Sequence, residues 1–235
     1  MAKIGDNCNV SGLIIVYADA DCVVVDKPAG MPSHPLTELK GDSALEFVCE
    51  SYPEIKTASD KPFEGGLVHR LDTGTSGLLV FARTHESYLK LRKAFSNNQI
   101  QKTYIALIEG QLEQDCVINY PIAHHPKNKA KMVAITPKNK YFRGKPQAAS
   151  TRVSIVPPLQ KGGRGDFTLI ALEIHGGRRH QIRVHLAAIG HPLVGDSLYG
   201  AQPIIWRAGH ALHADSISLP GGQEVHATKT HFFMQ

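Results

Sequence analysis

The sequence predicts an α+β protein whose sheet is mixed and mostly antiparallel, flanked by helices and loops. Short β-branched runs recur along the chain, and only a few segments with helical caps or periodicity lie among them. Glycine- and proline-rich breakers separate most of these runs. The 235 residues contain no internal repeat, long linker or low-complexity tract, so one continuous domain is the simplest account.

In the N-terminal half, the runs 13–17 and 22–25 are typical of two strands joined by the turn "ADAD". The loop "DKPAGMPSHP" follows them. We expect a helix over 43–51, because a capping residue precedes it and a proline lies just beyond it. The apolar run 77–82 predicts a strand, and 84–97 predicts a helix with apolar residues on one face.

In the C-terminal half, strands are predicted over 103–108, 150–156 and 167–174. The run 176–192, "GGRRHQIRVHLAAIGHP", is typical of a loop that enters a helix, and its final Gly-His-Pro is typical of a helix stop. The tail 210–233 predicts two strands joined by a Pro-Gly-Gly turn.

Composition excludes several classes of protein. Hydrophobic residues make up 42% and charged residues 20% of the chain, as in ordinary soluble globular proteins. No run approaches the ~18 apolar residues of a membrane span, and the N-terminus lacks the apolar core of a signal peptide. The four cysteines are scattered without a C-x-x-C pair, which disfavours a disulfide framework or structural zinc site. The sequence therefore predicts a protein of the reducing cytoplasm.

Positive charge is concentrated in one part of the chain. The net charge is +5, and no Asp or Glu occurs between Cys116 and Arg164. That stretch holds ten of the 26 basic residues: Lys127, Lys129, Lys131, Lys138, Lys140, Arg143, Lys145, Arg152, Lys161 and Arg164. Because protein surfaces normally mix both signs, the stretch indicates a polyanionic partner such as nucleic acid. The alternative is a solvated face or a loop with no partner.

The run "DTGTS" around Asp72 matches the pattern expected at the catalytic aspartate of an aspartic protease. Such an enzyme needs two carboxylates that share a proton, and no second Asp-[Ser/Thr]-Gly occurs in the chain. Arg70 precedes Asp72 by two residues and favours a permanently ionised carboxylate. An aspartic protease is therefore the remote alternative, and a purely structural turn cap is another.

Several longer motifs resemble one enzyme family. "GLVHRLDTGTSGLLVFART" resembles the H-R-L-D-x-x-T-S-G catalytic motif of the RluA-type pseudouridine synthases. "LIIVYADADCVVVDKPAGMPSHP", "QKTYIALIEG", "GGRRHQIRVHLAAIGHPLVGDSLYG" and "ALHADSISL" resemble further motifs of that family. The matches follow the family's order from about residue 13 to 219, and together they are highly specific. The chain departs from the family at Gly176, where a threonine is usual.

The resemblance implies the pseudouridine-synthase fold and an isomerase that converts specific uridines to pseudouridine in structured rRNA or tRNA. Asp72 is then the catalytic carboxylate, which either attacks C1′ or deprotonates C2′ of the ribose. Arg183 is expected to keep Asp72 ionised and oriented. Tyr104 is expected to stack on the uracil, and its oxygen to help remove the C5 proton.

The resemblance also implies that the target base is flipped out of the RNA stack, and Arg70 is the candidate to fill its place. Arg178, His180 and the lysines of the basic stretch, Lys127, Lys129 and Lys131, are the other predicted RNA-binding residues. His180 is expected in addition to hold the active-site loop by hydrogen bonds.

The family uses no cofactor, and the histidine spacing does not predict a metal site. We expect a monomer without a membrane partner. Residues 1–12 are expected to be a tail and 13–235 the catalytic domain, without a separate N-terminal RNA-binding module. An RNA-binding protein on the same fold that has lost catalysis is the alternative function.

Overall fold

The computed structural model describes residues 12–35, 42–61, 63–157, 167–175, 177–202 and 209–228. The chain forms two compact units. Unit 1 comprises residues 1–102 and 213–232, and unit 2 comprises residues 103–212 and 233–235. Among the described residues, no helix is long and apolar enough to cross a membrane.

Unit 1 contains five paired strands: β1 (Ile14–Ala18), β2 (Cys22–Lys27), β3 (Ser76–Ala82), β11 (Leu212–Ser218) and β12 (Glu224–His226). They are ordered β1-β2-β3-β11-β12. The β3–β11 pair is parallel and the other pairs are antiparallel. β2 and β3 are buried along their whole length, as expected for central strands with continuous apolar runs.

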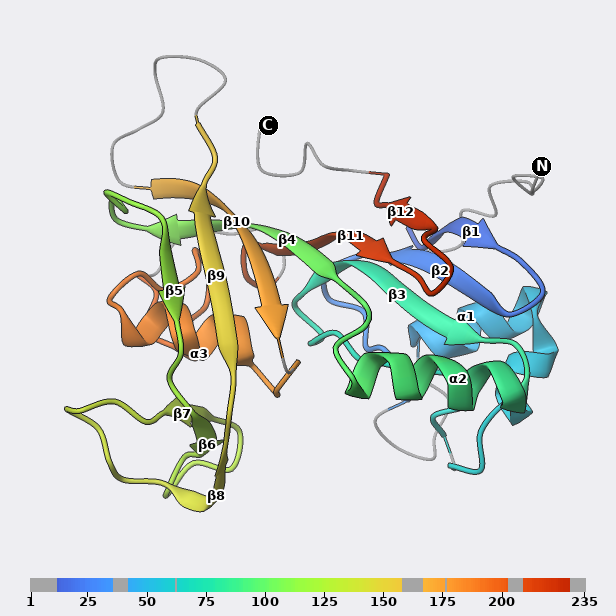
Figure 1. The fold of residues 1–235 in the computed structure, drawn as a ribbon, viewed down its shortest axis with the longest axis horizontal. Coiled ribbons are helices and arrows are strands. Elements are labelled where there is room, and N and C mark those ends of the chain that lie inside the picture. The colour runs from blue at the N-terminus through green and yellow to red at the C-terminus, as the bar shows by residue number, and fades with distance from the viewer. Residues whose placement is uncertain are drawn as a thin grey trace. The chain divides into compact units, whose positions relative to one another are not determined.

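The helices of unit 1 begin where their capping residues predict. Ser43 and Thr84 each accept a hydrogen bond from the backbone of the first turn, and each forms a capping box at α1 (Ala44–Ser51) and α2 (His85–Ser96). A 3₁₀ turn, η1 (Pro53–Thr57), follows α1 directly. α2 lies beside β3 (Figure 1). Its buried side chains Tyr88, Leu91 and Ala94 share one core cluster with side chains of β2 and β3.

Unit 2 contains the strands β4 (Lys102–Glu109), β5 (Cys116–Ile118), β9 (Ser150–Ile155) and β10 (Phe167–His175). They are ordered β4-β10-β9-β5, and all pairs are antiparallel. The helix of this unit is α3 (Gln181–Ala188). Side chains of α3 are buried along its first six residues, which shows that it is packed rather than solvated.

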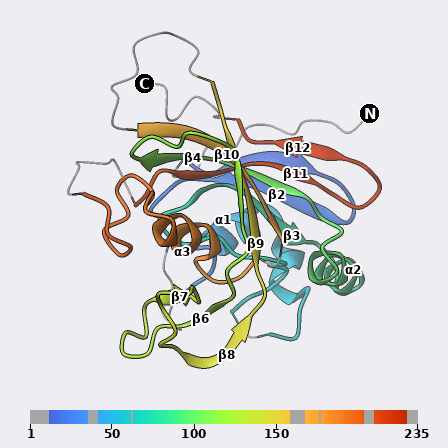
Figure 2. The same ribbon diagram turned by 60° about the vertical axis from the view of Figure 1, so that its left-hand side comes forward.

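A small three-stranded sheet interrupts unit 2 between β5 and β9. Its strands are β6 (Ile122–His124), β7 (Met132–Ala134) and β8 (Arg143–Gln147), in the order β7-β6-β8. It lies at the ends of β5 and β9 in both views (Figures 1 and 2). We call residues 122–147 the basic arm, because they carry seven lysines and arginines without an acidic residue.

The predicted fold class is confirmed. The helices expected over 43–51 and 84–97 and the strands expected over 13–17, 22–25, 77–82, 103–108, 150–156 and 167–174 are present within one or two residues, and α3 lies within the run 176–192. The two C-terminal strands and their turn are also present. The strands β5 to β8 and the turn η1 were not predicted. The domain boundary at residue 13 stays a prediction, since residues 1–11 lie outside the described ranges.

Candidate active site

Asp72 lies in a tight turn of unit 1, which we define as residues 69–75 and call the Asp72 turn. The Thr75 N–H donates to the Asp72 carbonyl at 2.9 Å, which closes the turn. Ser33 ties the turn to the preceding loop, because its hydroxyl donates to the Leu71 carbonyl at 2.8 Å and accepts from the Leu71 N–H at 3.1 Å. The Asp72 side chain itself is half-buried.

The Lys-Pro-Ala-Gly loop, residues 27–30, also forms hydrogen bonds to the Asp72 turn. The Gly30 N–H donates to the Thr73 carbonyl at 2.8 Å. The side chain of Lys27 is fully buried, and its Nζ donates to the carbonyls of Met31 at 2.7 Å, Pro28 at 2.9 Å and Thr73 at 3.4 Å. A buried ammonium that bonds three carbonyls fixes their positions relative to one another.

Burial and nearby charges have opposite effects on the pKa of Lys27. Burial lowers the pKa of its ammonium to about 7, and the negative charges of Asp72 and Asp26 act in the opposite direction. The positive charge of Lys27 therefore favours an ionised carboxylate at Asp72.

His69 fixes the start of the Asp72 turn. Its Nε2 accepts a hydrogen bond from the Val80 N–H at 3.2 Å, and its ring stacks on Phe95 with centroids 4.7 Å apart. Burial lowers the pKa of the imidazole well below its usual value, and the nearby cations Lys102 and Arg92 lower it further. His69 therefore stays neutral, as its acceptor role at Nε2 requires.

The strand that follows the turn is anchored by the parallel pairing with β11. Ser76 Oγ lies 2.9 Å from His213 Nδ1, and both side chains are buried. Gly77 has φ +105°, and a Cβ there would lie 2.3 Å from the Ala214 carbonyl oxygen. Only glycine permits this close approach of the two backbones.

Arg70 points to the surface of the same turn. Its side chain is exposed, and Nη1 lies 3.4 Å from His34 Nε2. An exposed guanidinium next to a half-buried carboxylate suits the predicted contact with RNA, which stays a prediction.

In unit 2, Arg183 projects from α3 and forms a bidentate ion pair with Asp196. Nε lies 2.8 Å from Oδ2 and Nη2 lies 2.9 Å from Oδ1. The Arg183 side chain is 10% exposed and that of Asp196 is 1% exposed. The pair uses two of the five N–H donors of the guanidinium. The predicted pairing of Arg183 with Asp72 stays a prediction, and Asp196 is a partner that we did not predict.

The loop before α3 is held by side-chain bonds, as expected for His180. His180 caps α3 with φ +54°, and its Nδ1 lies 2.8 Å from the Tyr199 hydroxyl. Gln181 Nε2 donates at 2.9 Å to the first carbonyl of β9, and Arg178 Nε donates at 3.2 Å to the Ala148 carbonyl. These bonds give His180 a structural role, and direct RNA contact by His180 or Arg178 stays a prediction.

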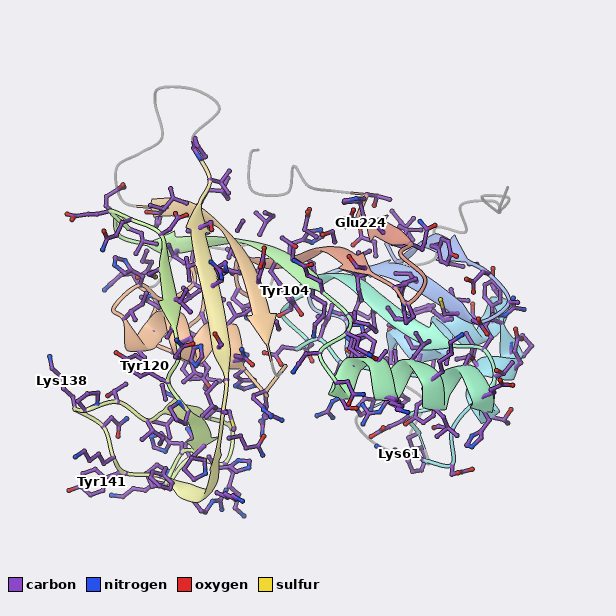
Figure 3. All side chains as sticks on the ribbon, viewed as in Figure 1. Lys61, Tyr104, Tyr120, Lys138, Tyr141 and Glu224 are labelled. Atoms are coloured by element: carbon purple, nitrogen blue, oxygen red, sulfur yellow. The ribbon has the colours of Figure 1, made fainter. Side chains whose placement is uncertain are left out.

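Tyr104 lies near the start of β4, where Figure 3 labels it. Its side chain is buried, and it pairs across the sheet with Leu172 of β10. Unit 2 therefore holds Tyr104, Arg183, His180 and Arg178, whereas unit 1 holds Asp72 and Arg70.

The predicted RNA-binding lysines lie in the loop between β6 and β7 of the basic arm. Lys127 and Lys129 are exposed, and Lys131 is half-buried with its Nζ 6.0 Å from the centre of the Tyr199 ring. Bonds from the Lys127 and Asn128 N–H groups to His125 Nδ1 order this loop.

The structure adds two aromatic residues that we did not predict. Tyr141 is 81% exposed and Phe142 is 38% exposed. Exposed Lys138, Lys140 and Arg143 flank them. Figure 3 shows Lys138 and Tyr141 at the outer edge of the basic arm. The sequence "KNKYFRGK" places two aromatic residues between basic ones, a pattern that indicates nucleic-acid binding. The sequence alone did not show that the two rings face solvent.

Among the described residues, no group of three or more His, Cys, Asp or Glu side chains could hold a metal ion. Lys27 lies near enough to Asp72 for their charges to interact.

Comparison with known proteins decides the family. The model of the RNA pseudouridylate synthase family matches residues 21–188, which include the Asp72 turn, Tyr104 and Arg183. The chain belongs to the RNA pseudouridylate synthases. The resemblance on which the prediction relied is thereby confirmed.

The similar RNA pseudouridylate synthases include curated bacterial proteins. The ribosomal large subunit pseudouridine synthase D of Nitrosomonas europaea is 35% identical over 215 residues, which cover 88% of this chain and 58% of that protein. The enzyme of the same name from Yersinia pestis is 37% identical over 81% of this chain and 54% of that protein. The chain thus spans little more than half the length of these relatives.

Solved structures of human RNA pseudouridylate synthases share the fold. The human RNA pseudouridylate synthase domain containing 1 has a TM-score of 0.71 at 24% identity and covers 92% of this chain and 82% of that one. Domain containing 4 has a TM-score of 0.64 at 22% identity, over 91% of this chain and 86% of that one. The family match covers the run "DTGTS", so the aspartic-protease alternative is set aside.

Proposed function

We propose that this protein converts specific uridines to pseudouridine in structured RNA, with Asp72 as the catalytic carboxylate. The observation that carries the proposal is the Asp72 turn. Ser33, Gly30 and Lys27 fix its backbone, and it occupies the H-R-L-D motif of a chain that belongs to the RNA pseudouridylate synthases. A purely structural turn cap does not explain why three residues of the 27–33 loop bond a turn whose carboxylate remains half-buried and solvent-accessible.

The reaction exchanges one glycosidic bond for another. The C1′–N1 bond of uridine breaks, the uracil turns, C5 bonds to C1′, and the C5 proton leaves while N1 gains a proton. Asp72 acts either as the nucleophile at C1′ or as the base at C2′, and both roles require an ionised carboxylate. Tyr104 stacks on the flipped uracil and its oxygen helps to remove the C5 proton, and Arg183 stabilises the Asp72 carboxylate.

Base flipping leaves a gap in the RNA stack, and we propose that Arg70 fills it. Its exposed guanidinium, two residues from Asp72, has the planar shape that stacks between bases. The basic arm supplies contacts to RNA phosphates through Lys127, Lys129 and Lys131. Its exposed Tyr141 and Phe142 supply stacking surfaces for unpaired bases.

Ribosomal RNA is the first substrate to test, because the bacterial relatives are named for the large ribosomal subunit. The alternative substrate is tRNA. The protein should release tritium from one of these RNA pools labelled at C5 of uridine, since C5 exchanges its proton for the new glycosidic bond. Absence of release from both pools, together with retained RNA binding, would instead favour a non-catalytic RNA-binding protein.

Asp72→Asn tests the catalytic role directly. This variant removes the charge and keeps the shape of the side chain, so tritium release should fall by about a thousandfold or more while RNA affinity stays within a fewfold of wild type. Asp60→Asn, at an exposed aspartate of the same unit, is the matched control and should keep full activity. Normal release by Asp72→Asn would contradict the mechanism.

A further inference from the structure

Tyr199 contacts three segments of unit 2: strand β7 of the basic arm, helix α3 and the loop that contains Asp196. Its ring packs against the apolar cluster that contains Met132 of β7 and Val184 of α3. Its own N–H donates at 3.0 Å to the carbonyl of Asp196, the residue that pairs with Arg183. The side chain therefore contacts the basic arm, the helix and the loop that holds the arginine.

The hydroxyl of Tyr199 joins the basic arm to the start of α3. It accepts a hydrogen bond from the Met132 N–H at 2.9 Å and lies 2.8 Å from His180 Nδ1. Met132 is the first residue of β7 and follows Lys131 directly. A displacement of the loop that carries Lys131 is therefore transmitted to the tyrosine through a backbone hydrogen bond.

The ring of Tyr199 lies beside two cations. The Arg183 Cζ lies 5.2 Å and the Lys131 Nζ lies 6.0 Å from its centre. Both distances fall within the range of cation–π attraction. The His180 ring meets the Tyr199 ring edge-on at 5.7 Å, which fixes the plane of the tyrosine.

We propose that Tyr199 is a positioning residue that couples RNA contact at Lys131 to the orientation of the Arg183 guanidinium. This inference rests on the proposed function. A phosphate bound at Lys131 orders the end of the β6–β7 loop, the Met132–Tyr199 hydrogen bond carries that order to the ring, and the ring with Asp196 fixes the guanidinium. The enzyme is thus fully active only when the basic arm holds RNA.

A double-mutant cycle between Lys131 and Tyr199 tests this coupling. Lys131→Met should lower kcat about tenfold at saturating RNA, because it disturbs Arg183 in addition to weakening binding. Tyr199→Phe keeps the ring and removes the hydroxyl, and kcat should again fall about tenfold. In the Tyr199→Phe background, Lys131→Met should change KM but lower kcat no further.

Two variants serve as controls. Lys129→Met removes an exposed lysine of the same loop and should raise KM without affecting kcat in either background. Tyr17→Phe removes a tyrosine hydroxyl that donates to Asp19 at 2.7 Å in unit 1, and should leave kcat unchanged. Independent, multiplicative effects of Lys131→Met and Tyr199→Phe on kcat would overturn the proposal. So would wild-type kcat in Tyr199→Phe.

A second readout does not depend on turnover or on the folding of the Tyr199 variant. The NMR resonance of the Arg183 Nε–H should shift when wild-type protein is titrated with an RNA hairpin, and the shift should disappear in Lys131→Met at RNA saturation. An unchanged shift in Lys131→Met would overturn the coupling. If wild type binds the RNA but releases no tritium, the proposed function fails while this readout still tests the coupling.

Discussion

The Asp72 turn and the basic arm are held by different kinds of contact. At the Asp72 turn, Ser33, Gly30 and Lys27 bond to backbone carbonyls and N–H groups within unit 1. The basic arm is joined to Tyr199 by a bond from the Met132 N–H to the tyrosine hydroxyl, and next to it side chains bond side chains in the Arg183–Asp196 pair and between His180 and Tyr199. The first arrangement fixes the backbone of one turn, whereas the second fixes the positions of side chains.

The largest expected effect comes from comparing two glycines with positive φ. At Gly77 the neighbouring backbone leaves no room for a side chain, whereas at Gly190 only the backbone conformation favours glycine. Gly77→Ala places a Cβ 2.3 Å from the Ala214 carbonyl, so β11 must move, and we expect the free energy of unfolding to fall by more than about 3 kcal/mol. Gly190, which ends α3 at φ +90°, has no atom within 4 Å of an added Cβ. Gly190→Ala should therefore cost only about 1 kcal/mol.

Urea unfolding followed by circular dichroism measures both losses. Both variants carry the same chemical change at a positive φ, so they are matched except for the neighbouring backbone. Equal losses would show that conformation, and not the close approach of β3 to β11, dominates at Gly77.

The same contrast explains what the sequence could predict. Short contiguous motifs contain the Asp72 turn with Arg70 and the Lys-Pro-Ala-Gly loop, so both the motifs and their association with one family could be recognised from the sequence. The helix caps at Ser43 and Thr84 could be predicted for a similar reason, because a cap depends on residues three positions apart.

The basic arm was not predicted as a sheet because its strands are too short to show a period. β6 and β7 have three residues each, and β8, "RGKPQ", has no large apolar residue. They form strands because they pair with one another, which is a tertiary effect. The Arg183–Asp196 pair was missed because the family motif suggested another partner, and a 13-residue spacing carries no local signal.

The next largest effect is on RNA binding. It separates the contribution of the lysine charges of the basic arm from that of aromatic stacking. Replacing Lys127, Lys129 and Lys131 together by glutamine should weaken RNA binding by about 10- to 100-fold at low salt. It should also reduce the slope of log K against log salt concentration by about two, because fewer counterions are released. Tyr141→Ala should weaken binding to RNA with unpaired bases by about 5- to 100-fold and leave the salt slope unchanged.

Filter binding at several salt concentrations, with a hairpin that has an unpaired loop and with a fully paired duplex, checks these expectations. Phe63→Ala, at a 54% exposed aromatic of unit 1, is the matched control and should have no effect. An unchanged salt slope in the triple-lysine variant would remove the β6–β7 loop from the RNA interface. A loss in Tyr141→Ala that is equal for hairpin and duplex would argue against stacking.

The smallest effect concerns buried neutral histidines, which occur in both units. Burial lowers the pKa of His213 in unit 1 and of His185 in unit 2 below the usual 6.5, and it lowers the pKa of His69 further. Above pH 6.5 these groups are neutral in both the folded and the unfolded states. As the pH falls below 6.5, the unfolded state binds protons that the folded state excludes, so stability is lost.

Each such histidine adds up to about 1.4 kcal/mol per pH unit to that loss. His185 bonds both Thr151 and the Tyr120 carbonyl at 2.8 Å, and His185→Gln should lower stability at pH 7.5 but flatten the decline between pH 6.5 and 5. An undiminished slope in His185→Gln would show that His185 does not cause the acid sensitivity, and His69, the first residue of the Asp72 turn, would then be the next histidine to replace.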